Sequence, residues 1–146
     1  MRAILMMVLF VFSLSFSDVF EMIHTSQSAM RVQQTKMNTI AENIANISTT
    51  KTKDGDAYYQ KSVIIKTDRK TNRPYVSAIE DRPNTVMKIF DPTNPDADEN
   101  GYVYEADNSL SNELVDMAMT RRLYDANAAV FNSAKSVAQT LMNLGK

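Results

Sequence analysis

The sequence predicts a mainly α protein with a small β-rich insertion, whose long N- and C-terminal helices pair as a coiled-coil-like bundle. Near both ends of the chain, apolar residues recur at alternating steps of four and three, whereas the middle is polar and rich in turn residues. A 4-3 alternation keeps one stripe of an α-helix facing a partner. Helices of this kind at both ends are typical of an assembly part and not of an enzyme.

The composition of the 146 residues narrows the function further. The net charge of −1 gives no global field that favours nucleic acid or an anionic membrane. The chain contains no cysteine and one histidine, His24, which excludes disulfides and thiolate metal sites and leaves little for a histidine-based site. No residue pattern pairs a nucleophile with a base. We therefore expect no enzymatic activity, no cofactor, no metal site, no nucleic-acid partner and no small-molecule substrate.

Residues 1–17 have the pattern of a secretory signal peptide. Arg2 supplies a positive charge, residues 3–12 form an unbroken apolar run, and small residues follow up to Ser17. The run is too short for a comfortable membrane span, which needs about 20 residues. We interpret residues 1–17 as a signal peptide or N-terminal extension; the alternative is a buried or misannotated leader.

An N-terminal helix is predicted within residues 18–50. Asp18 can cap a helix that begins at Val19, and neither proline nor glycine interrupts the chain up to Ile47. Polar side chains on the stripe are expected to set the register of packing. The predicted stripe consists of Val19, Ile23, Ser26, Met30, Gln33, Met37, Ile40, Ile44 and Ile47.

Residues 51–108 are predicted to form a small β-rich module. Asp54, Gly55 and Asp56 predict a tight turn. Residues 91–95 must be irregular because they contain two prolines. The module has too few apolar residues for a deep core. Its expected strands are residues 58–66, 75–79, 85–90 and 102–104.

A C-terminal helix is predicted within residues 109–146, starting near Ser109 or Ser111 and packing with the N-terminal helix. Its apolar face is wide because two stripes run side by side. The first is Leu123, Asn127, Val130, Ala134, Val137, Leu141 and Leu144, and the second is Leu114, Met117, Tyr124, Phe131, Ala138 and Met142.

Two other motifs match known binding sites, one for calcium and one for phosphate, but each also has a simpler interpretation. Residues 96–107 match several positions of a helix-loop-helix calcium loop, but Pro92 and Pro95 prevent the required preceding helix, so an acidic turn is favoured. A basic cluster could bind phosphate, but the acidic residues near it favour the interpretation that it is a solvent-exposed charged face. The cluster comprises Lys61, Lys66, Arg69, Lys70 and Arg73.

Four blocks of the sequence resemble signature blocks of the flagellar basal-body rod proteins of the C type, which belong to the proximal rod. The blocks are Ser28 to Met30, Ile40 to Asn46, Asp91 to Val103, and Arg122 to Asn127. The resemblance implies that the terminal helices pack axially into a tube with the middle module outward. It also implies location in the rod within the periplasm after export, with copies of the chain and other rod proteins as partners.

The predicted function is that of a structural subunit of the bacterial flagellar rod, which transmits torque from motor to hook. The alternative is a secreted calcium-dependent or adhesive binding module. The expected helix-packing and assembly residues are Val19, Ile23, Met30, Met37, Ile40, Asn43, Ile44, Asn46, Leu123, Tyr124, Asn127, Val130, Val137 and Leu141. The expected family motif loop comprises Asp91, Pro92, Pro95, Asp98, Gly101 and Tyr102.

Overall fold

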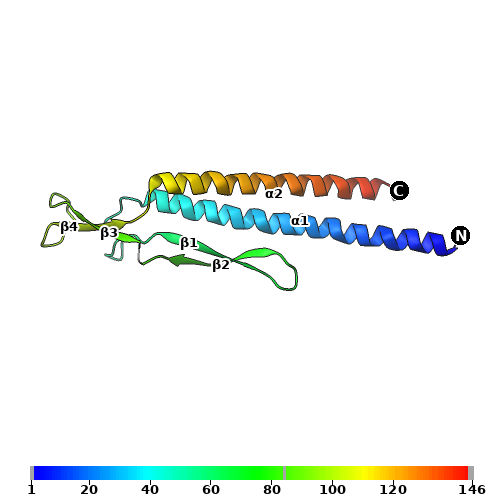
Figure 1. Cartoon of the computed structure of the whole chain (residues 1–146), viewed down its shortest axis with the longest axis horizontal. Helices are drawn as coiled ribbons and strands as arrows, with labels where there is room; N and C mark the ends of the chain where they lie inside the picture. Colours follow the sequence, from blue (N-terminus) through cyan, green and yellow to red (C-terminus); the bar gives the residue numbers. More distant parts are fainter. Residues whose placement is uncertain (1, 84, 145–146) are drawn as a thin grey trace.

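The computed structural model describes residues 2–83 and 85–144, and the side chains of residues 18–83 and 85–144. Two long helices, α1 (Arg2–Ala45) and α2 (Leu110–Leu144), lie side by side and run antiparallel (Figure 1). Between them in the sequence come β1 (Lys61–Thr67), β2 (Pro74–Asp81), β3 (Val86–Phe90) and β4 (Tyr102–Ala106). The fold is thus mainly α with a small β insertion, as the sequence predicts.

Helix α1 is one continuous rod, because residues 2–45 contain neither proline nor glycine. It passes without a break through the boundary predicted between residues 17 and 18. Removal of the first 17 residues stays a prediction. Over the residues that the structure describes, neither helix combines the length and apolarity needed to cross a membrane.

The four strands form two separate antiparallel hairpins. Strands β1 and β2 pair from Lys61 opposite Asp81 to Thr67 opposite Pro74, with an irregularity between Ile64 and Ile65. Strands β3 and β4 pair from Val86 opposite Ala106 to Phe90 opposite Tyr102.

The hairpins point in opposite directions. The β1–β2 hairpin packs along α1 on the side away from α2, whereas the β3–β4 hairpin projects beyond the ends of both helices (Figure 1). The first strand begins at Lys61, later than the predicted residue 58. The cause is that residues 58–60 bring Tyr58 and Gln60 to side chains of the two helices.

The core is thin and distributed along the contacts of α1. Ala134 and Ala138 are buried on α2, and small side chains of this kind let the helix axes approach closely. The buried apolar side chains are Val32, Ile40, Tyr58, Val103, Ala106, Ala134 and Ala138.

Candidate functional site

The first candidate feature is the inner seam, the stripe on each helix that faces the other. On α2 this seam runs from Glu113 to Leu141 at alternating steps of four and three. Thr120 is fully buried within it, with no hydrogen-bond partner for its Oγ1 among the described residues. The α2 members that are buried or half-buried are Glu113, Met117, Thr120, Tyr124, Asn127, Phe131, Ala134, Ala138 and Leu141.

The predicted stripe on α1 lies entirely in buried or half-buried positions. Ser26 and Ile40 are buried, and Ser26 Oγ donates to the carbonyl oxygen of Met22 at 2.7 Å, so its hydroxyl is satisfied. The half-buried members are Val19, Ile23, Met30, Gln33, Met37, Ile44 and Ile47.

Four other predicted α2 residues flank the inner seam and are not covered by α1. Leu123, Val130, Val137 and Leu144 are spaced seven residues apart and are between 44% and 72% exposed. We call these four residues the α2 outer stripe. The part of the chain that the structure describes places no other helix or strand against α2 besides α1. An apolar row at heptad spacing on an exposed helix face is suited to packing against a further helix.

A second candidate feature, the polar junction, joins α1, α2 and the start of β1. It consists of Asn43, Tyr58, Gln60, Lys61 and Glu113. Asn43 is 2% exposed; its Nδ2 donates to the Lys61 carbonyl oxygen at 3.0 Å, and its Oδ1 accepts from the Lys61 backbone N–H at 2.9 Å. The Tyr58 hydroxyl donates to the same Oδ1 at 2.9 Å.

The α2 side of the junction is the buried carboxylate of Glu113. Gln60 Nε2 donates to Glu113 Oε1 at 2.6 Å, and Asn43 Nδ2 approaches the same oxygen at 3.4 Å. These contacts connect three elements that are far apart in sequence, so the junction fixes the register between the helices and the sheet.

Charges around Tyr58 affect its phenol. Burial, reinforced by the carboxylates of Glu42, Asp81 and Glu113, raises the pKa of Tyr58 to about 12. The phenol therefore stays protonated, and keeps donating to Asn43, at a higher pH than an ordinary tyrosine would. Lys61 Nζ pairs with Glu42 at the exposed rim.

The predicted motif loop connects β3 and β4 and is held by its own aspartates. Asp98 Oδ1 accepts from the backbone N–H of Asn100 at 2.8 Å and of Tyr102 at 2.9 Å. The Tyr102 N–H is the main cause that lowers the pKa of Asp98. Asp91 Oδ1 accepts from Thr93 Oγ1 at 2.7 Å, and this bond lowers the pKa of Asp91.

Gly101 closes this loop in a left-handed conformation, with φ of +79°. A Cβ at this position would lie 3.1 Å from Phe90 Cε2 and 3.1 Å from Pro92 Cβ, so only glycine fits without displacement. Phe90 and Tyr102 pack edge to face with ring centroids 5.2 Å apart. Pro95 is an exposed position of the same loop.

The loop does not support the calcium alternative. The carboxylate of Asp98, which would be a ligand, accepts hydrogen bonds from the backbone. Asp107, the twelfth position, lies beyond β4, at the far end of the strand from the loop. Among the described residues, no three His, Cys, Asp or Glu side chains are grouped so that they could hold a metal ion.

Of the predicted assembly residues, the structure brings Asn43 into the polar junction. Asn46 ends α1, where its Nδ2 donates to the Glu42 carbonyl oxygen at 2.8 Å. Tyr58, Gln60 and Glu113 were not predicted from the sequence to be parts of a site. Their signal was weak, because the contacts join residues between 15 and 70 positions apart.

Comparisons with known proteins agree on one family. A family model described as flagella basal body rod protein matches residues 23–51, which include Asn43 and Asn46. The flagellar basal-body rod protein FlgC of Aquifex aeolicus is 35% identical over 124 residues, covering 82% of this chain and 92% of the relative. FlgC of Borreliella burgdorferi and FlgC of Salmonella typhimurium are each 30% identical, with the same two coverages.

Proposed function

Because this chain belongs to the FlgC family of flagellar basal-body rod proteins, and is therefore a structural subunit of the rod, we propose that its paired helices carry torque between neighbouring subunits. The single observation that carries this proposal is the α2 outer stripe. Leu123, Val130, Val137 and Leu144 are exposed at heptad spacing beside the inner seam by which α2 packs on α1.

The energetics of the outer stripe favour occupation by another helix. Burying a Val or Leu side chain contributes about 1.5–3 kcal/mol. Four such side chains per subunit, repeated over many subunits, supply the free energy to hold a rod together and to resist shear between neighbours. The inner seam, with its 4-3 spacing, would then hold α1 and α2 together in a coiled-coil-like manner within each subunit.

The partners that fit this stripe are helices of other copies and of other rod proteins. We propose that the helix pairs lie along the rod axis and form the tube, with the β1–β2 hairpin on its outer side and the β3–β4 hairpin continuing past the helix ends. We further propose that the subunit is exported and acts in the periplasmic part of the basal body. No catalytic role and no cofactor are proposed for it.

The test is to make the outer stripe polar without touching the inner seam. We expect the triple variant Leu123→Ser, Val130→Ser, Val137→Ser to fold with unchanged helix content but to be absent from purified basal bodies, leaving cells non-motile. The matched control changes Asp125, Asn132 and Gln139 to Ser, which share the seven-residue spacing on the opposite flank of α2 and are exposed.

The measurement is the amount of subunit in isolated basal bodies, by quantitative mass spectrometry, in cells whose own copy is deleted. Circular dichroism of each purified variant checks the fold. If the outer-stripe variant is incorporated into basal bodies as well as the control, the proposal that this stripe carries torque between subunits is wrong.

A further inference from the structure

Charge is strongly segregated along the middle of this nearly neutral chain. Residues 89–120 contain eight acidic residues and no Lys or Arg, whereas residues 61–73 contain five Lys or Arg and one acidic residue. Such segregation creates local fields of opposite sign, even though the net charge is only −1. The basic region lies in the β1–β2 hairpin, and five of the eight acidic residues lie in the β3–β4 hairpin, whereas the other three follow β4 or lie on α2.

The basic tip consists of Lys66 near the end of β1 and of Arg69 and Lys70 in the turn between β1 and β2. All three side chains are exposed, and among the described residues none has a carboxylate within 4.0 Å. The turn that presents them is ordered, because Asp68 Oδ1 accepts from the backbone N–H of Lys70 at 2.9 Å and of Thr71 at 2.8 Å.

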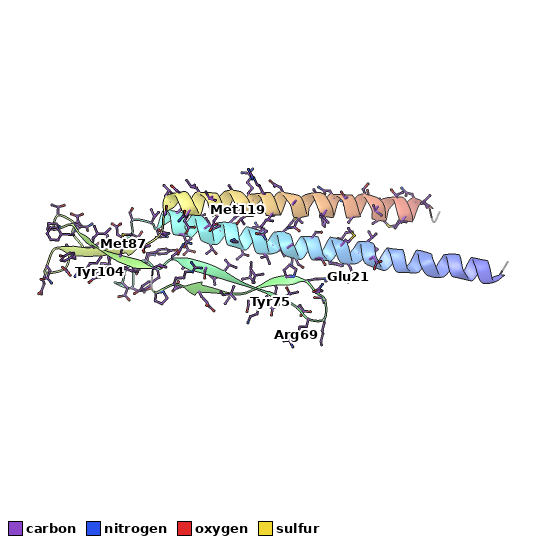
Figure 2. All side chains as sticks on the ribbon, viewed as in Figure 1. Glu21, Arg69, Tyr75, Met87, Tyr104 and Met119 are labelled. Carbon is purple, nitrogen blue, oxygen red and sulfur yellow. The ribbon has the colours of Figure 1, made fainter. Side chains whose placement is uncertain are left out.

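The hairpin that carries the basic tip is also fixed in direction. Arg73 Nη2 pairs with Glu21 Oε1 of α1 at 2.9 Å, which ties the turn to the helix. Figure 2 shows Glu21 on α1 close to the turn that carries Arg69. The basic tip is therefore exposed to solvent and held in a fixed position relative to α1.

The acidic loop consists of Asp96, Asp98 and Glu99, in the turn between β3 and β4. All three side chains are exposed, and their one cation within 4.0 Å among the described residues is Lys88, 3.8 Å from Asp98. The Asp98 hydrogen bonds to the backbone hold this turn in one conformation. Thr50 Oγ1 donates to Asp96 at 2.7 Å and joins the loop to the segment that follows α1.

The basic tip lies alongside the middle of α1, whereas the acidic loop lies past the end of the helix pair, at one end of the molecule (Figures 1 and 2). The β1–β2 turn extends along α1 toward its N-terminal half, and the β3–β4 hairpin extends past the other end of the helix pair (Figures 1 and 2). The two surfaces of one chain therefore do not meet each other. A second copy in the same orientation, displaced along the helix axis, can place its acidic loop beside the basic tip of the first.

We propose that successive copies of this chain dock head to tail, with the basic tip of one copy against the acidic loop of the next. Such a contact joins two different surfaces, so it propagates into a ring or helical array instead of closing as a dimer. Complementary charge fixes which neighbour and which register are chosen and speeds the encounter. The contact rests on the chain being a repeated rod subunit, but it uses no residue of the α2 outer stripe.

The test is a charge swap measured by sedimentation velocity on the full-length chain. One variant makes the tip acidic with Arg69→Glu and Lys70→Glu, and the other makes the loop basic with Asp96→Lys and Glu99→Lys. Each variant alone should associate about tenfold more weakly than the wild type, because like charges now face each other. A one-to-one mixture should recover association, since each acidic surface again meets a basic one.

The control reverses two exposed charges elsewhere, Asp125→Lys and Lys135→Glu on α2, and should associate like the wild type. Association of the wild type should also weaken about tenfold at high salt. Wild-type chain that stays monomeric at low salt, variants that associate normally, or a mixture without recovery would each overturn the contact. Binding to anionic lipid vesicles without self-association would overturn it as well.

The outcome of this charge-swap test can be distinguished from the outcome for the proposal that the α2 outer stripe carries torque. The outer-stripe variant retains the basic tip and the acidic loop, so it should keep salt-sensitive association while it fails to enter basal bodies. Loss of both behaviours in that variant would show that the charged surfaces do not form a contact of their own.

Discussion

The side-chain amide of Asn43 takes the place of a neighbouring strand for Lys61. Its Oδ1 accepts from the Lys61 N–H at 2.9 Å and its Nδ2 donates to the Lys61 carbonyl oxygen at 3.0 Å, so both backbone groups of that residue are satisfied by one side chain. On the other edge, the Arg82 N–H donates to the Gln60 carbonyl oxygen at 2.8 Å. The start of β1 is therefore held between α1 and β2.

Replacing Asn43 by Ala should destabilise the chain by about 2–4 kcal/mol, because two backbone groups and the Tyr58 hydroxyl lose a buried partner. Urea unfolding followed by circular dichroism measures the change. Asn38→Ala is the matched control, since Asn38 is exposed on the same helix, and it should change the free energy of unfolding by less than about 0.5 kcal/mol. Equal effects of the two substitutions would contradict the bridging role of Asn43.

Replacing Tyr58 by Phe should remove one hydrogen bond and cost about 1 kcal/mol at neutral pH. The difference from the wild type should shrink at high pH. The folded pKa of about 12 lies above the ordinary value of 10, so the contribution of the phenol is complete below pH 10 and is lost as the pH rises through 12.

The measurement for Tyr58 is the free energy of unfolding of the wild type and of Tyr58→Phe between pH 8 and pH 12. Comparing the two proteins cancels the titration of the other five tyrosines. A constant difference over this range would mean that the phenol titrates at its ordinary pKa in the folded chain.

Replacing Gly101 by Ala should destabilise the chain more than the same change at Gly55. Both glycines have positive φ, +79° and +94°, which costs an alanine about 1–2 kcal/mol at either position. Only at Gly101 does the added Cβ meet neighbours, Phe90 and Pro92 at 3.1 Å, whereas nothing lies within 4 Å at Gly55. The excess, about 1 kcal/mol or more, should appear in thermal or urea unfolding. Equal losses would mean that the loop relaxes freely around residue 101.

The fold class could be predicted from the sequence because its signals are local. The apolar spacing of both helices, the prolines of the β3–β4 loop and the glycine turns each act within a few residues. It was harder to predict which residues of α2 face α1. Of the predicted positions, Asn127, Ala134 and Leu141 belong to the inner seam, while Leu123, Val130 and Val137 lie beside it and are exposed.

The positions of α2 that face α1 were hard to predict because the apolar face of α2 is wide enough for two partners. Spacing alone does not say which edge of this face meets α1. Small Ala134 and Ala138 allow the close approach on one edge of this face, so Leu123, Val130 and Val137 on the other edge stay exposed. The polar junction lay beyond prediction for a different reason. Asn43 and Glu113 meet across 70 residues, and no periodic pattern marks a single long-range pair.

Replacing Thr120 by Val should stabilise the chain. Thr120 is 0% exposed in the inner seam, and its Oγ1 has no hydrogen-bond partner among the described residues, so the folded state bears the cost of a desolvated hydroxyl. Valine keeps the branched shape without that hydroxyl and has a similar helix propensity. The gain should be about 1 kcal/mol, seen as a higher urea midpoint with an unchanged slope. The control, Thr140→Val, alters an exposed threonine of the same helix whose Oγ1 donates to Ser136 at 3.0 Å, and it should bring no gain. A loss of stability at position 120 would show that this hydroxyl makes a favourable contact in the folded chain.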